Sequence, residues 1–276
     1  MRIAFIGGGN MATALIGGLL RDGMAPASIH AVEVDPQRLA ALRQKFGIAG
    51  SSAPDDGLRG TDATVFAVKP QQMRQACTQC RPWLDGGFAL TIAAGIPAAS
   101  VAVWSGRPQV VRAMPNTPAL IGAGITGMSA GAGLAPAARG LAERIMSAAG
   151  EVVWFDEEAM LDAVTAVSGS GPAYVFFFIE ALQAAGQAMG MTADQARRLS
   201  IATFRGASQL AYESDQPVQA LREQVTSKGG TTAAALEKMQ TLGLHPQIVA
   251  AVLAARDRSR ELASTYGDAP QAPGTG

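Results

Sequence analysis

Short apolar runs alternate with helical patterns over the first half of the chain. The apolar runs are predicted to be strands, at residues 2–6, 29–34, 63–68, 88–94, 109–114, 124–130 and 151–155. Helical spacing is found between them, at residues 10–23, 35–47, 97–106 and 135–150. Because strands that alternate with helices form parallel sheets, we expect an α/β domain over residues 1–156 with helices on both faces of its sheet.

The strand pattern stops after Phe155, and the rest of the chain is helical in its spacing. The predicted helices are residues 156–169, 171–190, 192–214, 217–225, 231–240 and 245–267. We therefore predict an all-helical domain over residues 157–266, followed by a disordered tail at 267–276. Helix 171–190 is apolar nearly all round, which indicates burial on every side, within the domain or between subunits.

Composition excludes some partners. Lys plus Arg and Asp plus Glu both number 22, so no basic excess suggests nucleic-acid binding. Only 16% of residues are charged and 48% are hydrophobic, which favours a homo-oligomer. The most apolar stretch, 173–190, contains Glu180, Gln183 and Gln187, so we expect no membrane span.

The chain start and the cysteines bear on compartment and metal binding. The first residues form a strand pattern with no signal-peptide layout, so we expect a cytoplasmic protein. Cys77 and Cys80 form a single CxxC, and the chain has two histidines. We predict reduced thiols on a helix and no metal site.

The sequence GGGNMA at 7–12 has the G-x-G-x-x-A spacing of a dinucleotide-binding turn. It follows a predicted strand, opens a predicted helix, and precedes Glu33 at the end of the second strand. Gly7 would allow the tight turn, Gly9 would let the backbone approach a pyrophosphate, and Ala12 would keep the helix close to the sheet. This context predicts a Rossmann-like sheet that binds NADPH or NADH.

Other residues at the carboxyl edge of the sheet are expected to contact the same cofactor. A carboxylate at Glu33 or Asp35 can accept a hydrogen bond from a ribose 2′-hydroxyl and would repel a 2′-phosphate, whereas Arg38 could offset that repulsion. This tilts the choice slightly toward NADH but leaves it open. The predicted cofactor-binding residues are Ile6, Gly7, Gly8, Gly9, Asn10, Met11, Ala12, Glu33, Asp35, Ala67, Val68, Lys69, Pro70, Ala93, Ala94, Gly95 and Asn116.

A second glycine turn lies far from the first. Residues 225–236, VTSKGGTTAAAL, place two glycines between hydroxyl residues immediately before a predicted helix. Such turns bind anions. Five segments of the chain resemble the pyrroline-5-carboxylate reductase family. They are this turn extended to VTSKGGTTAAALEKM at 225–239, SGSGPAY at 168–174, FIGGGNMA, AVKPQ and MPNTPA.

The resemblance covers the chain to about residue 266. It implies NAD(P)H-dependent reduction of 1-pyrroline-5-carboxylate to L-proline, the last step of proline biosynthesis. It also implies dimers formed through the helical domain, often gathered into larger assemblies.

The resemblance also implies roles for residues of the second turn. The substrate is a small cyclic imine with one carboxylate, which the N–H groups of Gly229, Gly230 and Thr231 and the Ser227 hydroxyl would suit. Thr232 matches the threonine that hydrogen-bonds the ring nitrogen and is assigned as the catalytic residue. Its substrate-binding companions are predicted to be Ser227, Gly229, Gly230, Thr231 and Glu158.

The absence of a strong acid from both turns fits an imine substrate. The two histidines, His30 and His245, lie outside both turns, whereas a ketone reductase usually needs a proton donor beside the carbonyl. A cyclic imine can be protonated by water, so the site needs mainly to orient it.

Two other functions remain as alternatives. A β-hydroxyacid dehydrogenase-like oxidoreductase would carry a catalytic lysine on a long helix, but 171–190 contains none and Lys228 lies in a loop. A non-catalytic nicotinamide-nucleotide sensor would account for the first turn and give no use for the second.

Overall fold

The computed structural model describes residues 1–131 and 133–267, so all of the predicted tail except Gly267 lies outside the described residues. Contacts divide the chain into two compact units. Unit 1 contains Met1–Ser170 and the chain from Ala255 onward, and unit 2 contains Gly171–Ala254. This division differs from the predicted boundary near residue 156, because the helix α6 (Met160–Val164) packs on two strands of the unit 1 sheet.

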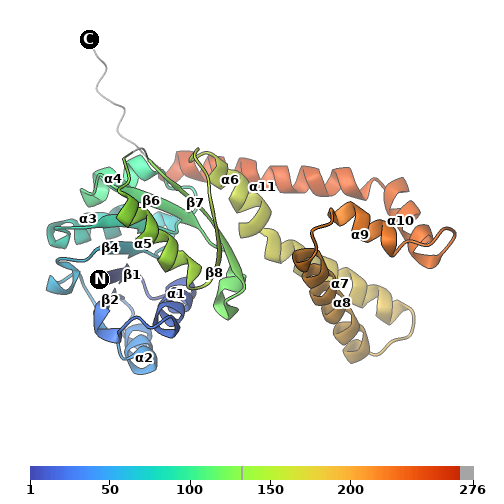
Figure 1. Cartoon of the computed structure of the whole chain (residues 1–276), viewed down its shortest axis with the longest axis horizontal. Helices are drawn as coiled ribbons and strands as arrows, with labels where there is room; N and C mark the ends of the chain where they lie inside the picture. The colour runs from blue at the N-terminus through green and yellow to red at the C-terminus, as the bar shows by residue number, and fades with distance from the viewer. Residues whose placement is uncertain (132, 268–276) are drawn as a thin grey trace, which may run out of the picture. The chain divides into compact units, whose positions relative to one another are not determined.

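A sheet flanked by helices forms the centre of unit 1 (Figure 1). It has eight strands in the order β3-β2-β1-β4-β5-β6-β7-β8. β1, β4 and β5 are buried along their whole length, as expected for continuous apolar runs. The strands are β1 (Ile3–Ile6), β2 (Ile29–Val32), β3 (Ala49–Ser51), β4 (Ala63–Phe66), β5 (Phe88–Thr91), β6 (Val110–Met114), β7 (Gly124–Ala130) and β8 (Gly150–Trp154).

The predicted parallel sheet is confirmed for β1 to β6 and wrong for the last two strands. β7 runs antiparallel to β6, and β8 is parallel to β7, so these two strands run opposite to the other six. The link from Met114 to Gly124 contains only the short turn η5 (Thr117–Ile121), which is too short for the crossover that a parallel strand needs. Strand β3 was not predicted, because its three residues, AGS, are too few to show a pattern.

Helices cover both faces of the sheet, as predicted. One apolar cluster joins Ile3 and Phe5 of β1 to α1 (Asn10–Arg21), α2 (Pro36–Phe46) and α5 (Pro136–Ser147). The other joins Ala4 and Ile6 to α3 (Met73–Cys80) and α4 (Ala98–Ser105). Alternate residues of β1 therefore enter opposite layers of the core.

Cys77 and Cys80 are free thiols in the second of these layers. Burial raises the pKa of each thiol to about 12. Both thiols are therefore protonated and unreactive at neutral pH.

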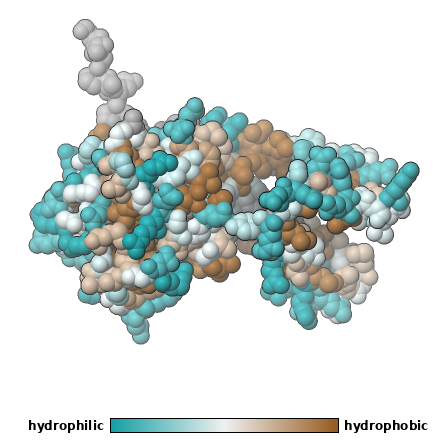
Figure 2. All heavy atoms as spheres, viewed as in Figure 1, coloured by the Kyte–Doolittle hydropathy of each residue, from teal (hydrophilic) through white to brown (hydrophobic). Residues whose placement is uncertain are grey.

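Unit 2 is entirely helical and has almost no buried interior of its own. It contains α7 (Gly171–Ala188), α8 (Ala193–Glu213), α9 (Val218–Gln224), α10 (Thr231–Thr241) and the first part of α11 (Leu244–Tyr266). Across this fully described segment only Gly186, Ala196 and Ser200 are buried. Phe177 of α7 is 68% exposed, and apolar surface is visible on both units (Figure 2).

In the described part of the chain, no helix combines the length and the apolar character that a bilayer crossing requires.

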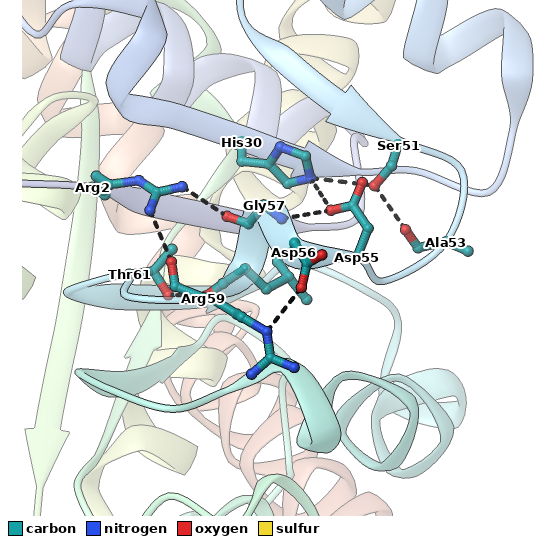
Figure 3. Close-up of polar contacts among 10 residues, drawn as sticks. Arg2, His30, Ser51, Ala53, Asp55, Asp56, Gly57, Arg59 and Thr61 are labelled. Carbon is teal, nitrogen blue, oxygen red and sulfur yellow. Dashed lines mark hydrogen bonds and ion pairs between the residues drawn. The ribbon is translucent and has the colours of Figure 1, made fainter.

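A polar network around His30 joins β2 to β3 and to the loop that follows β3 (Figure 3). His30 Nε2 lies 3.0 Å from Asp55 Oδ1 and 3.2 Å from Ser51 Oγ, and a side chain on Gly57 would overlap its ring. Burial lowers the pKa of His30, and the neighbouring Asp55 carboxylate offsets this only in part. The folded protein therefore favours the neutral form of the His30 side chain.

The His30 network should make folding stability sensitive to mild acid. Because the folded-state pKa of His30 lies below the unfolded value of 6.5, its share of stability is complete above that pH and is lost as the pH falls below it. We expect His30→Gln to reduce the decline in the free energy of unfolding between about pH 7.5 and 5.5, measured by urea denaturation. His245→Gln, at an exposed position, is the matched control. A wild-type slope in His30→Gln would contradict this role.

Candidate functional site

The turn between β1 and α1 can be made only by glycine at its first position. Gly7 has φ +97°, and a Cβ there would lie 2.7 Å from the carbonyl oxygen of Ala67. Gly9 differs, because it directly precedes α1 with an ordinary φ of −68° and a Cβ there would meet nothing within 4 Å. Ala12 is fully buried, so α1 lies close against the sheet.

The first turn of α1 has the donors that a diphosphate needs. No side chain caps this helix, which leaves the backbone N–H groups of Asn10 and Met11 at its N-terminus for an anion. The open space beside Gly9 gives the anion room to approach the backbone. The turn therefore fits the pyrophosphate of a dinucleotide, which is the ligand that its spacing predicts.

Glu33 is bound to this turn. Its side chain is 5% exposed, its Oε2 accepts a hydrogen bond from Gly8 N at 2.6 Å, and its Oε1 accepts one from Asp35 N at 2.8 Å. The carboxylate thus lies beside the glycine turn and keeps lone pairs that could accept from a ribose hydroxyl.

Asp35 has a structural task that the sequence analysis did not assign. Its Oδ1 accepts hydrogen bonds from Gln37 N at 2.9 Å and from Arg38 N at 3.3 Å, so it caps α2. The signal was present in the sequence, since an Asp followed by Pro is a common helix start. Contact of Asp35 with a cofactor stays a prediction.

A hollow of about 490 Å³ lies beside the glycine turn. Two cations line it, Arg38 and Lys45, which both lie on α2. The full lining is Gly8, Gly9, Asn10, Thr13, Arg38, Ala41, Leu42 and Lys45. Sequence reasoning missed Thr13 and Lys45, although the seven-residue spacing of Arg38 and Lys45 places them on one face of a helix.

The ends of β4, β5 and β6 reach the same edge of the sheet. Ala67 N donates to Ile6 O at 2.8 Å, which brings segment 67–70 beside the glycine turn. Segment 93–95 follows β5, with Ala93 and Gly95 buried. Lys69 is exposed at the start of the short turn η3 (Pro70–Gln72). Ligand contacts of these segments stay predictions.

Asn116 has an internal partner. Its side chain is buried, and its Oδ1 accepts a hydrogen bond from Ile125 N at 3.0 Å. It therefore holds the link between β6 and β7, a role that the sequence analysis did not anticipate.

Glu158 lies in unit 1, where its Oε1 accepts hydrogen bonds from Ala98 N and from Arg112 Nη1, both at 2.7 Å. It therefore caps α4 and neutralises a largely buried arginine. Its predicted contact with substrate stays a prediction.

The second glycine turn, in unit 2, leads from α9 into α10. Gly229 has φ +71°, and Gly230 directly precedes α10, which has no side-chain cap. Gly230 N donates to Ser227 O at 3.0 Å, so this N–H is not free for a ligand as the sequence analysis expected. The N–H groups of Thr231 and Thr232, in the uncapped first turn, are the better anion donors.

Neither turn contains a histidine, a cysteine, a tyrosine or a carboxylic acid, and Lys228 is the one ionisable side chain within residues 7–12 and 225–232. The two turns can thus bind and orient anions, and they leave proton supply to solvent or substrate.

Comparisons with known proteins agree for both parts of the chain. Residues 158–262 match the family model described as pyrroline-5-carboxylate reductase dimerisation. Residues 2–95 match the one described as NADP oxidoreductase, coenzyme F420-dependent. A pyrroline-5-carboxylate reductase of Pseudomonas aeruginosa is 42% identical, over 96% of this chain and 98% of its own.

Solved structures show the same likeness. A pyrroline-5-carboxylate reductase from Coxiella burnetii superposes with a TM-score of 0.88 at 36% identity, covering 95% of this chain and 98% of its own. The Plasmodium falciparum pyrroline carboxylate reductase, solved with NADP bound, superposes with a TM-score of 0.83 at 26% identity and the same coverage.

Two alanine substitutions should separate the part of the first glycine turn in folding from its part in dinucleotide binding. We expect Gly7→Ala to lower the free energy of unfolding by about 1–3 kcal/mol, because the new Cβ meets the Ala67 carbonyl at a strained φ. Gly9→Ala should fold normally yet bind a dinucleotide about ten-fold more weakly or worse, because its methyl enters the anion's approach. Urea denaturation and fluorescence titration measure the two effects. Unchanged dinucleotide affinity in Gly9→Ala would remove the turn from the ligand site.

Proposed function

The chain belongs to the pyrroline-5-carboxylate reductase family, and we propose that it reduces 1-pyrroline-5-carboxylate to L-proline with NADPH or NADH. The observation that carries the proposal is the presence of two uncapped helix starts after glycine turns, one at α1 and one at α10. One suits a diphosphate and the other a small carboxylate. Residues 1–156 would hold the cofactor, and 157–266 would hold the substrate and the dimer contacts.

In this proposal the chain's part in the reaction is to bind and orient. When bound, the nicotinamide cofactor supplies a hydride from its C4 to the imine C5. The N–H groups of Asn10 and Met11 hold the diphosphate, and the anchored Glu33 carboxylate accepts from the adenosine ribose. These contacts fix the position of the cofactor relative to unit 1.

The second turn would hold the substrate. The N–H groups of Thr231 and Thr232 and the Ser227 hydroxyl bind its carboxylate, and the Thr232 hydroxyl bonds the ring nitrogen. Since the imine takes its proton from water, no side-chain acid is required. Hydride transfer then needs the two ligands to meet, within one chain or between two chains of the oligomer.

The dimerisation match over 158–262 indicates a homo-oligomer, and we propose a homodimer formed through the helical unit. Unit 2 exposes large apolar side chains, Phe176, Phe177, Leu182, Leu199 and Leu210 among them, and buries only three residues. An apolar surface of this extent needs a partner to cover it. A second copy supplies equivalent surface, and this accounts for the apolar helix that the sequence analysis expected to be buried.

Unit 1 adds a further apolar hollow of about 300 Å³. Val153, Met160 and Val167, all exposed, lie in its wall, and the last two fall within the dimerisation match. This hollow supports the same assembly.

A cytoplasmic location also belongs to the proposal, because the reaction consumes a reduced nicotinamide cofactor.

Turnover of the proposed substrate tests the function directly, and a substitution at Thr232 tests the proposed mechanism. Oxidation of NADPH or NADH is followed by absorbance after 1-pyrroline-5-carboxylate is added. We expect Thr232→Ala to lower kcat/KM about 30- to 100-fold, as for a lost hydrogen bond to a charged group, with cofactor affinity unchanged.

The matched control is Thr226→Ala, because the Thr226 hydroxyl donates to Arg222 O of the preceding helix at 2.6 Å. That variant should retain wild-type turnover. Full activity in Thr232→Ala would remove Thr232 from the mechanism, and cofactor binding without any turnover in the wild type would favour the sensor alternative.

Glu33 provides the test of cofactor choice. We expect Glu33→Ser, and the charge-only variant Glu33→Gln, to raise the ratio of kcat/KM for NADPH over NADH about ten-fold, because the carboxylate repels a 2′-phosphate. Steady-state kinetics with both cofactors measure the ratio. If the ratio stays at its wild-type value in both variants, another residue selects the cofactor.

A further inference from the structure

The loop after β5, residues 92–97, is covered by the end of α11. Gly95 in this loop has φ +74°, and a Cβ there would lie 3.2 Å from Ala263 N of α11. A Cβ on Gly267, immediately after α11, would overlap the ring of Pro97. Ser100 Oγ of α4 donates to Gly267 O at 3.1 Å. The last turns of α11 therefore define where this loop can lie.

The short helix α6 holds the end of α11 in place. Ser259 Oγ of α11 donates to Asp162 Oδ1 at 2.7 Å, and Ser259 is 3% exposed. Arg260 Nε lies 3.8 Å from Asp162 Oδ2 on the same carboxylate. Because a buried hydroxyl is costly to leave without a partner, the Ser259–Asp162 bond fixes the register of α11 against α6.

α6 is in turn linked to α4 by Glu158, which lies two residues before the start of α6. Glu158 receives the hydrogen bond of Ala98 N, the first residue of α4, and pairs with Arg112 of β6. The contacts thus close a ring within unit 1, from α4 through α6 to α11 and back to α4. The loop 92–97 leads directly into this ring.

The order of the strands places this loop beside one half of the cofactor. The phosphate turn follows β1, and the adenosine side is marked by Glu33 at the end of β2. β4 and β5 lie on the other side of β1, so the nicotinamide half extends over their carboxyl ends. Loop 92–97 follows β5 and therefore borders the nicotinamide half.

We propose that the Asp162–Ser259 contact is a positioning device that holds the end of α11 against loop 92–97 and so sets the place of the nicotinamide ring. The inference rests on the proposed function for the identity of the cofactor. Asp162 and Ser259 touch no reacting atom in this account, and they act through the loop.

Binding of whole and truncated cofactor separates positioning from general destabilisation. We expect Ser259→Ala to raise the Kd of NADPH and NADH about 3- to 10-fold, the scale of one lost hydrogen bond. The Kd of ADP-ribose, which lacks the nicotinamide, should not change. Gly95→Ala should give the same pattern, because it pushes the loop away from α11 while leaving the Asp162–Ser259 contact in place.

Ser264→Ala is the matched control, because Ser264 lies exposed on the same turns of α11 and donates only to its own helix, to Glu261 O at 2.8 Å. It should bind both ligands as the wild type does. If Ser259→Ala does not fold, Gly95→Ala carries the same comparison in a chain whose buried pair is intact.

Two outcomes overturn the inference: equal weakening of dinucleotide and ADP-ribose, or no change in either. Failure of the proposed function is a separate result, namely a wild-type protein that binds no dinucleotide or turns over no imine. A wild type that binds dinucleotide without turnover still allows the titrations to decide on the positioning device.

Discussion

The hydrogen bond from the Gly8 N–H to the buried Glu33 carboxylate is the contact on which the nucleotide end of unit 1 depends. It joins the turn after β1 to the end of β2, and the second oxygen of Glu33 extends the link to the start of α2. A carboxylate with so little exposure is stable only when backbone donors replace its water. Gly8 gives its N–H to Glu33, whereas the N–H groups of Asn10 and Met11 have no side-chain cap and would remain for the phosphates of the proposed cofactor.

The local features of unit 1 could be predicted because they depend on neighbouring residues. The glycine turn and the buried strands follow from spacing and apolar runs alone. Strand β3 is too short for a pattern, and the reversal at β7 depends on how β6 and β7 pair. The hydrogen bond from Ala98 N, at the start of α4, to Glu158 could not be predicted, because the two residues are far apart in the chain and only the folded structure brings them together.

The second turn shows where sequence reasoning ends. Its glycines and the helix start after them were recognisable, but the hydrogen bond from Gly230 N to Ser227 O depends on the path of the turn itself. The role of Thr232 came from family resemblance, since a threonine at a helix start has the same pattern whether or not it meets a substrate. The bond between Asp162 and Ser259 spans 97 positions and left no trace in the local pattern.

The thin interior of unit 2 has a thermodynamic consequence. Helices that bury only Gly186, Ala196 and Ser200 gain little from folding as a single copy, so most of their apolar burial must come from association. For these helices folding and association are coupled, so the midpoint of their unfolding rises with protein concentration. A single value for the stability of this protein therefore has meaning only together with the concentration at which it was obtained.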